Sequence, residues 1–350
     1  MKATYHKYIL NFKRPSGTSR GVMNEKETWF IILEKDGKKG IGECGILRGL
    51  SVDDRPDYED KLRWTCANIH LGKDQLWEAL IEFPSIQFGM EMAFQSLGSE
   101  SPFLLFSSEF TNGLKSIPIN GLVWMGEESF MKQQIEEKLA DGFRCIKLKI
   151  GAIDFDKELQ LLAYIRQHFT PDQVEIRVDA NGAFDLNIAL YKITQLSGFK
   201  LHSIEQPIQK SHTDSMSELC KTTPIPIALD EELIGVFSFE EKEQLLLKIK
   251  PQYIILKPSF IGGFRGTKEW ILLAEKYKIG WWITSALESN IGLNAIAQWT
   301  FLQHNLMPQG LGTGALYTNN FGCPLQVSQG QLWYKKELNW EFNFDDFLVK

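Results

Sequence analysis

The chain has 350 residues, which is long for one ordinary domain but suits a barrel of about 200 to 250 residues joined to a smaller domain. Hydrophobic residues make up 43% and charged residues 23%, proportions that are typical of a globular protein and that exclude a disordered chain. The net charge of -6 leaves no basic surplus to hold a phosphate backbone, so we exclude nucleic acid as a partner.

The N-terminus, the cysteines and the histidines argue against a secreted protein, a membrane protein and a zinc protein. The apolar patch Tyr8–Leu10 is too short for a signal-peptide core, and no apolar run in the sequence reaches membrane-spanning length. We therefore expect a cytoplasmic protein with no membrane partner. The 5 cysteines are widely spaced without a Cys-x-x-Cys pair and the 6 histidines are dispersed, which argues against a disulfide framework and a zinc site.

The N-terminal part of the sequence predicts an α+β unit. Residues 1–35 alternate in polarity and are rich in aromatic and β-branched types, which indicates a hairpin or meander with a turn at Arg14–Gly17. A second turn at Asp36–Gly37 precedes another strand, and Asp57–Gly98 shows helical spacing. Strands followed by helices form an α+β capping domain, which we assign to residues 1–112.

From residue 113 onward, strands and helices alternate. This order predicts a modified (β/α)8 TIM-type barrel at residues 113–321, an α/β fold, and the aromatic-rich tail 322–350 is expected to return to the capping domain and complete it. The strands are expected near 116–122, 143–149, 174–179, 200–205, 225–230, 252–257, 279–284 and 307–311, and the clearest helices at 127–142, 154–169, 185–198 and 267–280.

Five consecutive predicted strands each end in an ionisable residue. The steps between these residues are 30, 26, 25 and 27, which leave room for one helix and two loops in each unit. In a closed barrel the strand ends meet at one mouth, where barrel active sites lie. Residues far apart in the sequence would therefore converge on one site, namely Lys149, Asp179, Glu205, Asp230 and Lys257.

The three carboxylates favour a metal site. A single acid at a strand end is more often a helix cap or a solvated loop residue, as Asp179, Asp230 and Glu205 could each be if taken alone. Three acids crowded into one mouth repel one another, and a bound cation is the simplest reason to keep them together. Oxygen ligands without His or Cys select a hard ion, and three carboxylates with room for water suit Mg²⁺.

The lysines at the same mouth can supply acid–base chemistry. Lys147 and Lys149 point to one face of their strand, and Lys257 ends a strand about opposite in the ring. A lysine directed into a barrel beside a divalent cation has its pKa lowered and can act as a base. The alternative is that the lysines only neutralise the acids. Together the groups fit removal of a proton next to a carboxylate, with the enediolate held on the metal.

The motifs that carry these residues resemble a known family. Lys147-Leu148-Lys149, VDAN, IEQP, LDEE and LKP follow one another as in the muconate-lactonizing branch of the enolase superfamily, whose sites use a Lys or His base with Mg²⁺. Longer segments, among them GIGECGILRGLS and TSALESNIGLNAIAQ, are most similar to the o-succinylbenzoate synthase family within that branch. The resemblance covers nearly the whole chain.

The resemblance implies a reaction, a metal and a role for each residue. The reaction is dehydration of 2-succinyl-6-hydroxy-2,4-cyclohexadiene-1-carboxylate to o-succinylbenzoate in menaquinone biosynthesis, with Mg²⁺ as cofactor and Mn²⁺ as its substitute. Lys149 would remove the proton and return it to the departing hydroxyl, Lys257 would stabilise the enediolate as a cation, and Lys147 would depress the pKa of Lys149. The metal ligands would be Asp179, Glu205 and Asp230, with Glu231 as an outer partner of the metal cluster or Lys257, and Asn181, Ser285, Ser289, Gly310 and Thr313 would lie near the substrate.

Two alternatives stay open at this point. An N-acylamino acid racemase or dipeptide epimerase would use the same catalytic set, and a barrel could bind an anionic ligand without turning it over. The segment QGLGTG lacks the Asp-x-Asp motif that holds a substrate ammonium in the epimerases, which favours a carboxylate substrate without an α-amino group. The capping loops Arg14–Val22 and Gly45–Asp54 are expected to close over that small-molecule substrate. Homo-oligomer formation is left open.

Overall fold

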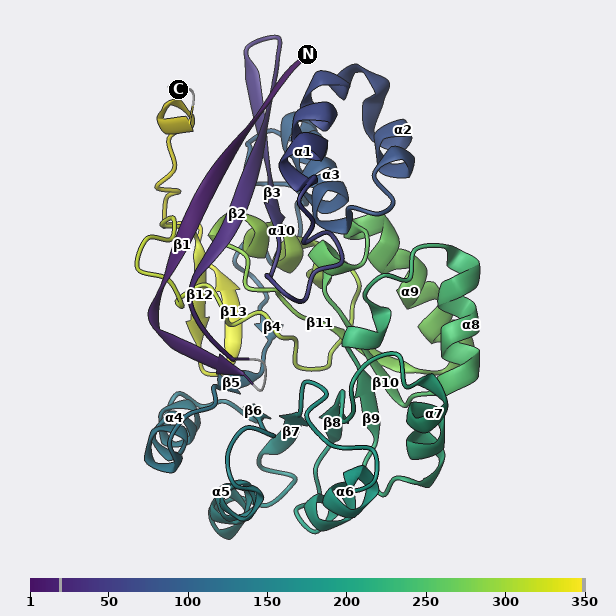
Figure 1. Cartoon of the computed structure of the whole chain (residues 1–350). Helices are drawn as coiled ribbons and strands as arrows, with labels where there is room; N and C mark the ends of the chain where they lie inside the picture. Colours follow the sequence, from purple (N-terminus) through teal and green to yellow (C-terminus); the bar gives the residue numbers. More distant parts are fainter. Residues whose placement is uncertain (19–20, 348–350) are drawn as a thin grey trace.

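The computed structural model of the protein describes residues 1–18 and 21–347. The capping domain is built on an antiparallel sheet of β1 (Lys2–Thr18), β2 (Gly21–Lys35) and β3 (Lys38–Gly45), in that order. In Figure 1 this sheet and the helices beside it lie above the barrel, so the capping domain covers one end of the barrel.

The first hairpin differs from the prediction. The turn expected at Arg14–Gly17 is wrong, because β1 continues through these residues to Thr18 and β2 begins at Gly21. The pairing register shifts between Asn11 and Ser16, and this irregularity on an edge strand accommodates Pro15, which has no N–H to donate. Ser19 and Arg20, which belong to the expected capping loop, lie outside the described residues.

The turn at Asp36–Gly37 is confirmed. Asp36 and Gly37 have φ of 51° and 77°, and two positive φ values in succession match the right-handed twist of the strands that they join. The helical region is also as predicted, with α1 (Tyr58–Ala67), α2 (Gly72–Ala79) and α3 (Pro84–Gly98). Buried residues of the sheet, including Trp29 and Ile31, pack against these helices and form a core of their own.

In the described part of the chain, the barrel has seven parallel strands and a short closing segment. The predicted first strand is divided: β4 (Ile117–Pro118) pairs with the C-terminal tail, and β5 (Gly121–Val123) begins the barrel sheet. The predicted eighth strand is reduced to the bridges Ile119↔Gln309 and Thr284↔Gly310, which close the ring. The other barrel strands are β6 (Cys145–Lys149), β7 (Glu175–Asp179), β8 (Ser203–Glu205), β9 (Ile227–Leu229), β10 (Tyr253–Leu256) and β11 (Gly280–Ile283).

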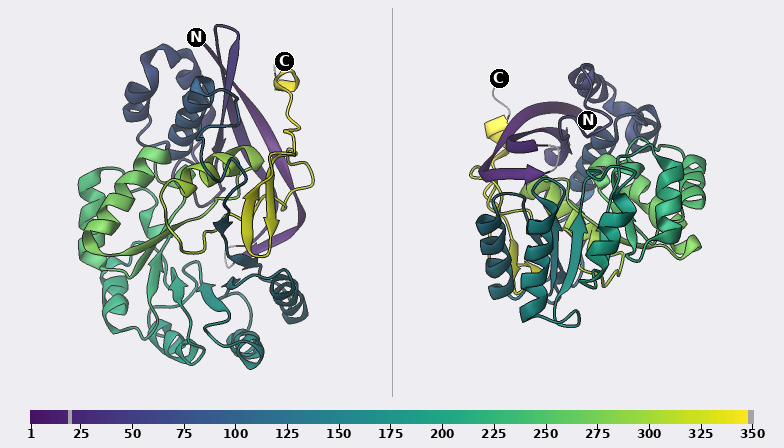
Figure 2. Two further views of the ribbon diagram at one scale, coloured as in Figure 1. Left: turned by 180° about the vertical axis from the view of Figure 1, so that it is seen from behind. Right: turned by 60° about the horizontal axis from the view of Figure 1, so that its bottom comes forward.

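Helices surround the barrel sheet, as Figure 2 shows from two further sides. The helix expected from residue 267 begins four residues earlier, because Gly262 and Gly263 take positive φ and start it where the sequence reads as a loop. Within the described residues, no helix is long and apolar enough to cross a membrane. The barrel helices are α4 (Glu128–Ala140), α5 (Phe155–His168), α6 (Ala189–Ser197), α7 (Thr213–Thr222), α8 (Phe239–Ile249), α9 (Gly263–Tyr277) and α10 (Asn290–Phe301).

The C-terminal tail joins both parts of the protein. Strands β12 (Leu325–Ser328) and β13 (Gln331–Tyr334) form a small sheet with β4 at the barrel edge. Farther on, Trp340 stacks on Phe103 with ring centroids 4.1 Å apart, and Phe347 contacts Phe30 of the capping sheet at 5.6 Å. Figure 1 shows this last segment rising beside the capping sheet, so the tail completes the capping domain as the sequence predicts.

Candidate active site

A cavity of about 370 Å³ lies where the carboxyl ends of the barrel strands face the capping domain. Three lysines from the barrel, Lys147, Lys149 and Lys257, line one part of it. Two capping segments, Gly21–Met23 and Leu47–Leu50, line the other part, so both expected capping loops contribute to its wall. A concave site at the carboxyl ends of parallel strands is the usual place for a barrel active site.

Strand register places the three predicted metal ligands side by side. Lys149 is the Cα partner of Asp179 across β6 and β7, and Asp179 is the partner of Glu205 across β7 and β8. Asp230 directly follows β9 on the next strand. All three carboxylates are buried, with at most 2% of each residue exposed.

Lysine ammonium groups neutralise these acids. Lys147 Nζ lies 2.8 Å from Asp179 Oδ2 and also forms an ion pair with Glu205. Lys257 forms an ion pair with Asp230. The ammonium of Lys147 lies between two of the acids. Within the described residues, no three carboxylate, His or Cys side chains are grouped as one metal-binding centre.

Glu205 nevertheless has the properties of a cation ligand. Its Oε1 is buried and has no hydrogen-bond partner among the described residues. Burial, followed by the charge of Asp179, raises the pKa of Glu205 well above its usual value despite the opposing charge of Lys147. A hard divalent cation would relieve both the repulsion and the unsatisfied oxygen, so the donor set of Asp179, Glu205 and Asp230 fits Mg²⁺ chemically.

Lys149 has the environment of a base. Burial lowers its pKa, the charge of Lys147 lowers it further, and the charge of Asp179 opposes both. Lys149 Nζ donates to Asp179 Oδ2 at 2.5 Å and to Asn181 Oδ1 at 2.9 Å. Asn181 is held in a left-handed conformation, with φ of 46°, and donates from Nδ2 to Glu231 Oε1 at 3.0 Å. The Lys149 ammonium is therefore fixed in direction by Asp179 and Asn181, both at the end of β7, and Glu231 holds Asn181 in turn.

Lys257 and Lys147 have the environment of permanent cations. Burial tends to lower the pKa of Lys257, but the charges of Asp230 and Glu205 outweigh it and raise that pKa, with a smaller contribution from Glu231. The pKa of Lys147 is likewise raised above its usual value by Asp179 and Glu205, against the effect of burial. Of the three lysines, Lys149 therefore has a lowered pKa, whereas Lys147 and Lys257 have raised ones.

The residues expected near the substrate divide into two groups. Ser285, Gly310 and Thr313 line the cavity, whereas neither Asn181 nor Ser289 is found among the described residues that do so. Thr313 Oγ1 is buried and has no hydrogen-bond partner in the described chain, so it is free to bind a ligand. The Ser285 hydroxyl donates to Glu288 Oε2 at 2.5 Å, so its proton is already used in a hydrogen bond within the protein.

Ser289 contacts the capping domain. Its Oγ accepts from Ile291 N at 3.2 Å as the N-cap of α10 and donates to Glu43 Oε2 at 2.6 Å. Glu43 on β3 and Glu288 are fully buried, and the buried Lys26 Nζ has its pKa lowered by burial while both acids oppose that shift. Sequence reasoning missed these three residues. A signal was present for Glu43, since GIGEC has no other charged residue and places one acid beside apolar neighbours.

Comparison with known proteins assigns the family. Residues 131–337 match the family model described as enolase C-terminal domain-like. The o-succinylbenzoate synthase of Desulfotalea psychrophila is 48% identical over 95% of this chain and 98% of its own length. A crystal structure of MenC from the same organism covers 95% of this chain and 99% of its own, with a TM-score of 0.84 and 45% identity.

More distant relatives have the same fold. The hydrophobic dipeptide epimerase of Flavobacteria bacterium is 26% identical over 66% of this chain and 68% of its own length. A dipeptide epimerase from Enterococcus faecalis, solved with Mg and the dipeptide L-Leu-L-Tyr, is 17% identical over 95% of this chain and 96% of its own, with a TM-score of 0.81. The chain belongs to the o-succinylbenzoate synthase family of the enolase superfamily.

Proposed function

We propose that the chain eliminates water from 2-succinyl-6-hydroxy-2,4-cyclohexadiene-1-carboxylate to give o-succinylbenzoate in menaquinone biosynthesis. The observation that carries this proposal is the 48% identity to the Desulfotalea psychrophila enzyme over nearly the full length of both chains. The epimerase of Flavobacteria bacterium is similar over a smaller part of the chain and at 26% identity. The activity is that of a carbon–oxygen lyase acting on a small carboxylate.

In this proposal Lys149 is the base. A base must be neutral when it takes the proton, and the lowered pKa of Lys149 favours that form. It removes the proton α to the substrate carboxylate, and the C–H electron pair passes into the enediolate. When the C–O bond breaks, the proton on Lys149 Nζ goes to the departing hydroxyl, which leaves as water. One group on one face therefore completes a syn elimination.

Lys257 is the proposed electrostatic partner of the enediolate. Its raised pKa keeps it positively charged, and it reaches the cavity from β10 on the other side of the mouth from Lys149. A fixed cation close to the developing negative charge lowers the barrier because it needs no reorganisation during the reaction. Asp179 and Asn181 hold the base in place by hydrogen bonds.

Asp179, Glu205 and Asp230 are the residues that would hold Mg²⁺ or Mn²⁺. When bound, the metal would act as a Lewis acid on the substrate carboxylate. The buried oxygen of Glu205 and the repulsion among the acids support this assignment. The epimerase from Enterococcus faecalis, which has the same fold, was solved with Mg.

The rest of the cavity suits an apolar ring and the chain attached to it. Its wall includes the apolar side chains of Leu122 and Trp124 and, from the capping loop, Leu50. Arg48 is a cation on the capping side, where its guanidinium is held by ion pairs with Glu27 and Asp54. An apolar wall with few polar groups fits the ring and succinyl chain of the proposed substrate.

The test is an assay of the purified protein with the dehydration substrate and, separately, with an N-succinylamino acid. We expect formation of the aromatic product that stops in excess EDTA and returns with Mg²⁺ or Mn²⁺. Full activity in EDTA would contradict the metal assignment. Racemisation of the amino acid without dehydration would contradict the proposed reaction and favour the racemase.

A further inference from the structure

Glu91 connects the capping domain to a helix of the barrel. This residue lies on α3, and 8% of it is exposed. Its Oε2 accepts a hydrogen bond from Phe264 N at 2.6 Å, and both of its oxygens accept from Arg265 N at 3.3 and 3.4 Å. A carboxyl group of one domain therefore satisfies backbone amides at the N-terminus of α9, a helix of the other domain.

The sequence of α9 is adapted to this contact. A Cβ atom built on Gly263 would lie 2.3 Å from Glu91 Oε2 and 3.0 Å from the backbone of Phe88, so a side chain there would displace the Glu91 carboxyl group and crowd α3. Gly262 and Gly263 also have φ of 94° and 70°, which glycine adopts without strain. The two glycines let α3 approach the start of α9 closely enough for Glu91 to reach the amides.

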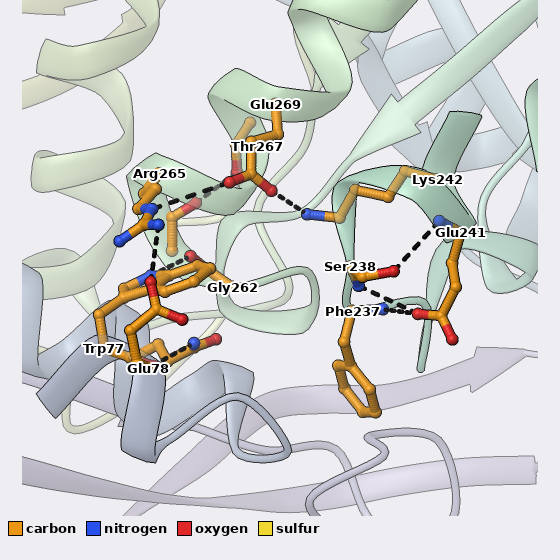
Figure 3. A network of polar contacts seen from close by, with 12 residues as sticks. Trp77, Glu78, Phe237, Ser238, Glu241, Lys242, Gly262, Arg265, Thr267 and Glu269 are labelled. Carbon is orange, nitrogen blue, oxygen red and sulfur yellow. Dashed lines mark hydrogen bonds and ion pairs between the residues drawn. The ribbon is translucent and has the colours of Figure 1, made fainter. Parts of the chain in front are cut away.

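Neighbouring contacts hold the same turn from the capping side. Trp77 Nε1 on α2 donates to Gly262 O at 3.1 Å, and the guanidinium of Arg265 lies 4.0 Å from the centre of a Trp77 ring. Arg265 also forms an ion pair with Glu78 Oε1 at 2.8 Å, but both side chains are exposed, so solvent screens this pair and it adds little to the hold on the turn. Figure 3 shows Trp77, Glu78, Gly262 and Arg265 gathered at this interface, with Lys242 and Glu269 beside them.

The turn leads directly back to Lys257. Only the short 3-10 helix Pro258–Phe260 and one further residue, Ile261, separate Lys257 from Gly262. Phe260 N donates to Lys257 O at 2.8 Å, and Ser259 Oγ donates to Glu288 Oε1 at 2.6 Å. Because this segment is buried and hydrogen-bonded, a displacement at the start of α9 would be transmitted to the backbone of Lys257.

A second contact of the same kind lies at the next helix. Glu43 Oε1 accepts from Ser289 N at 2.9 Å, and its Oε2 accepts from Gly292 N at 2.8 Å, both at the start of α10. Gly292 again leaves room, since a Cβ there would lie 2.7 Å from Glu43 Oε2. The capping domain thus places a carboxyl group at the N-terminus of each helix that follows β10 and β11.

We propose that Glu91 is a positioning residue for the reaction, which acts by fixing the turn between Lys257 and α9 against the capping domain that covers the cavity. The inference rests on the proposed role of Lys257 as the cation beside the enediolate. A small shift of Lys257 would weaken a contact made mainly in the transition state, so kcat would fall more than KM rises.

The experiment compares Glu91→Ala, Glu91→Gln and the control Glu78→Ala in the full-length protein with Mg²⁺. We expect Glu91→Ala to lower kcat by about tenfold to a hundredfold with a smaller change in KM. Its Phe264 and Arg265 amides should exchange with deuterium faster, as should the peptide that contains Lys257. Glu91→Gln should restore most of kcat, because its amide oxygen can accept from both backbone amides. Glu78→Ala removes only an exposed ion pair and should match the wild type.

Two results would overturn the proposal. One is faster exchange at Phe264 and Arg265 in Glu91→Ala with kcat and KM unchanged, which would make Glu91 a purely structural residue. The other is failure of Glu91→Gln to restore kcat. If Glu91→Ala does not fold, Glu91→Asp replaces it, since its shorter side chain cannot reach the amides and should lower kcat in the same way. Wild-type dehydration, measured alongside, tests the proposed function independently.

Discussion

The two sides of the barrel mouth present the same residue type in opposite electrostatic states. On the β6 side, Lys149 shares the carboxylate of Asp179 with Lys147, and burial with this second ammonium lowers its pKa. On the β10 side, Lys257 has Asp230 as its own partner, and its pKa is raised. Lys147 also pairs with Glu205 and keeps a raised pKa, so Lys149 is the lysine of the three whose pKa is lowered.

In the proposed mechanism, this difference would separate a base from a fixed charge without any change of side chain. It also distinguishes a dehydratase from a racemase in principle, because a racemase needs both lysines to exchange protons with the α-carbon, one from each face. A syn dehydratase needs one exchanging lysine and one cation. The asymmetry of the mouth supports the second arrangement.

Replacing Lys149 or Lys257 by arginine tests the difference between the two sides of the mouth most directly. This replacement has the largest expected effect on the rate of dehydration. Lys149→Arg keeps the charge but removes a usable base, and we expect kcat to fall by about a thousandfold or more, as it should in Lys149→Ala. Lys257→Arg keeps the cation and should retain more activity, although the planar guanidinium is bulkier than an ammonium. The measurement is single-turnover dehydration. If Lys149→Arg is the more active variant, the base lies on the other face.

The fold was largely predictable because the barrel repeats one unit. Apolar runs ending at Asp179, Glu205 and Lys257 have the length and spacing of buried strands, and the register of the sheet confirms that neighbouring ends adjoin. Local geometry was less predictable. The strand through Pro15 and the early start of α9 at Gly263 both depend on tertiary contacts that override a turn-like sequence.

The site was predictable only in part, for a physical reason. A charged residue that ends an apolar run can be recognised in the sequence. Its place in the fold follows as well, because the carboxyl ends of parallel barrel strands meet at one mouth. Glu43, Glu91 and Glu288 are different: each is buried by a contact between segments that lie far apart in the sequence. No local pattern tells such an acid from a solvated one, although an acid inside an apolar run is a signal to examine.

Glu205→Gln tests the metal that the proposed mechanism places between the two lysines. Glutamine keeps the shape but removes the charge, so we expect metal affinity to fall by at least tenfold while the protein stays folded, since Glu205 lies at the barrel mouth. Isothermal titration with Mg²⁺ and Mn²⁺ measures the affinity, and circular dichroism checks the fold. Unchanged metal affinity in a folded variant would exclude Glu205 as a ligand.

Lys147→Met tests why the two lysines differ. Methionine removes the ammonium of Lys147, so Lys149 becomes the one lysine paired with Asp179. Because the repulsion between the two ammonium groups is lost, the pKa of Lys149 should rise. Because the base works when neutral, kcat/KM increases with pH through that pKa, and the increase should move to higher pH in the variant. The pH profile of kcat/KM with saturating Mg²⁺ measures this. A profile that moves to lower pH, or does not move, would show that Lys147 does not set the pKa of Lys149.

The smallest expected effect is a pH dependence of the free energy of unfolding that arises from Glu91. This residue connects the Lys257 side of the barrel mouth to the capping domain. Burial raises the pKa of Glu91 from 4.5 to about 7, although the backbone amides of Phe264 and Arg265 oppose the shift. A raised carboxyl pKa adds stability that is fully present below about pH 4.5 and is lost as the pH rises through 7. The free energy of unfolding of the wild type should therefore decrease relative to that of Glu91→Gln by roughly 2 to 3 kcal/mol at most between pH 5 and pH 9. Urea unfolding of both proteins at the two pH values measures this difference, and the other titrating groups cancel because the two proteins share them. An equal difference at both pH values would mean that Glu91 ionises normally and that the contact with α9 admits water.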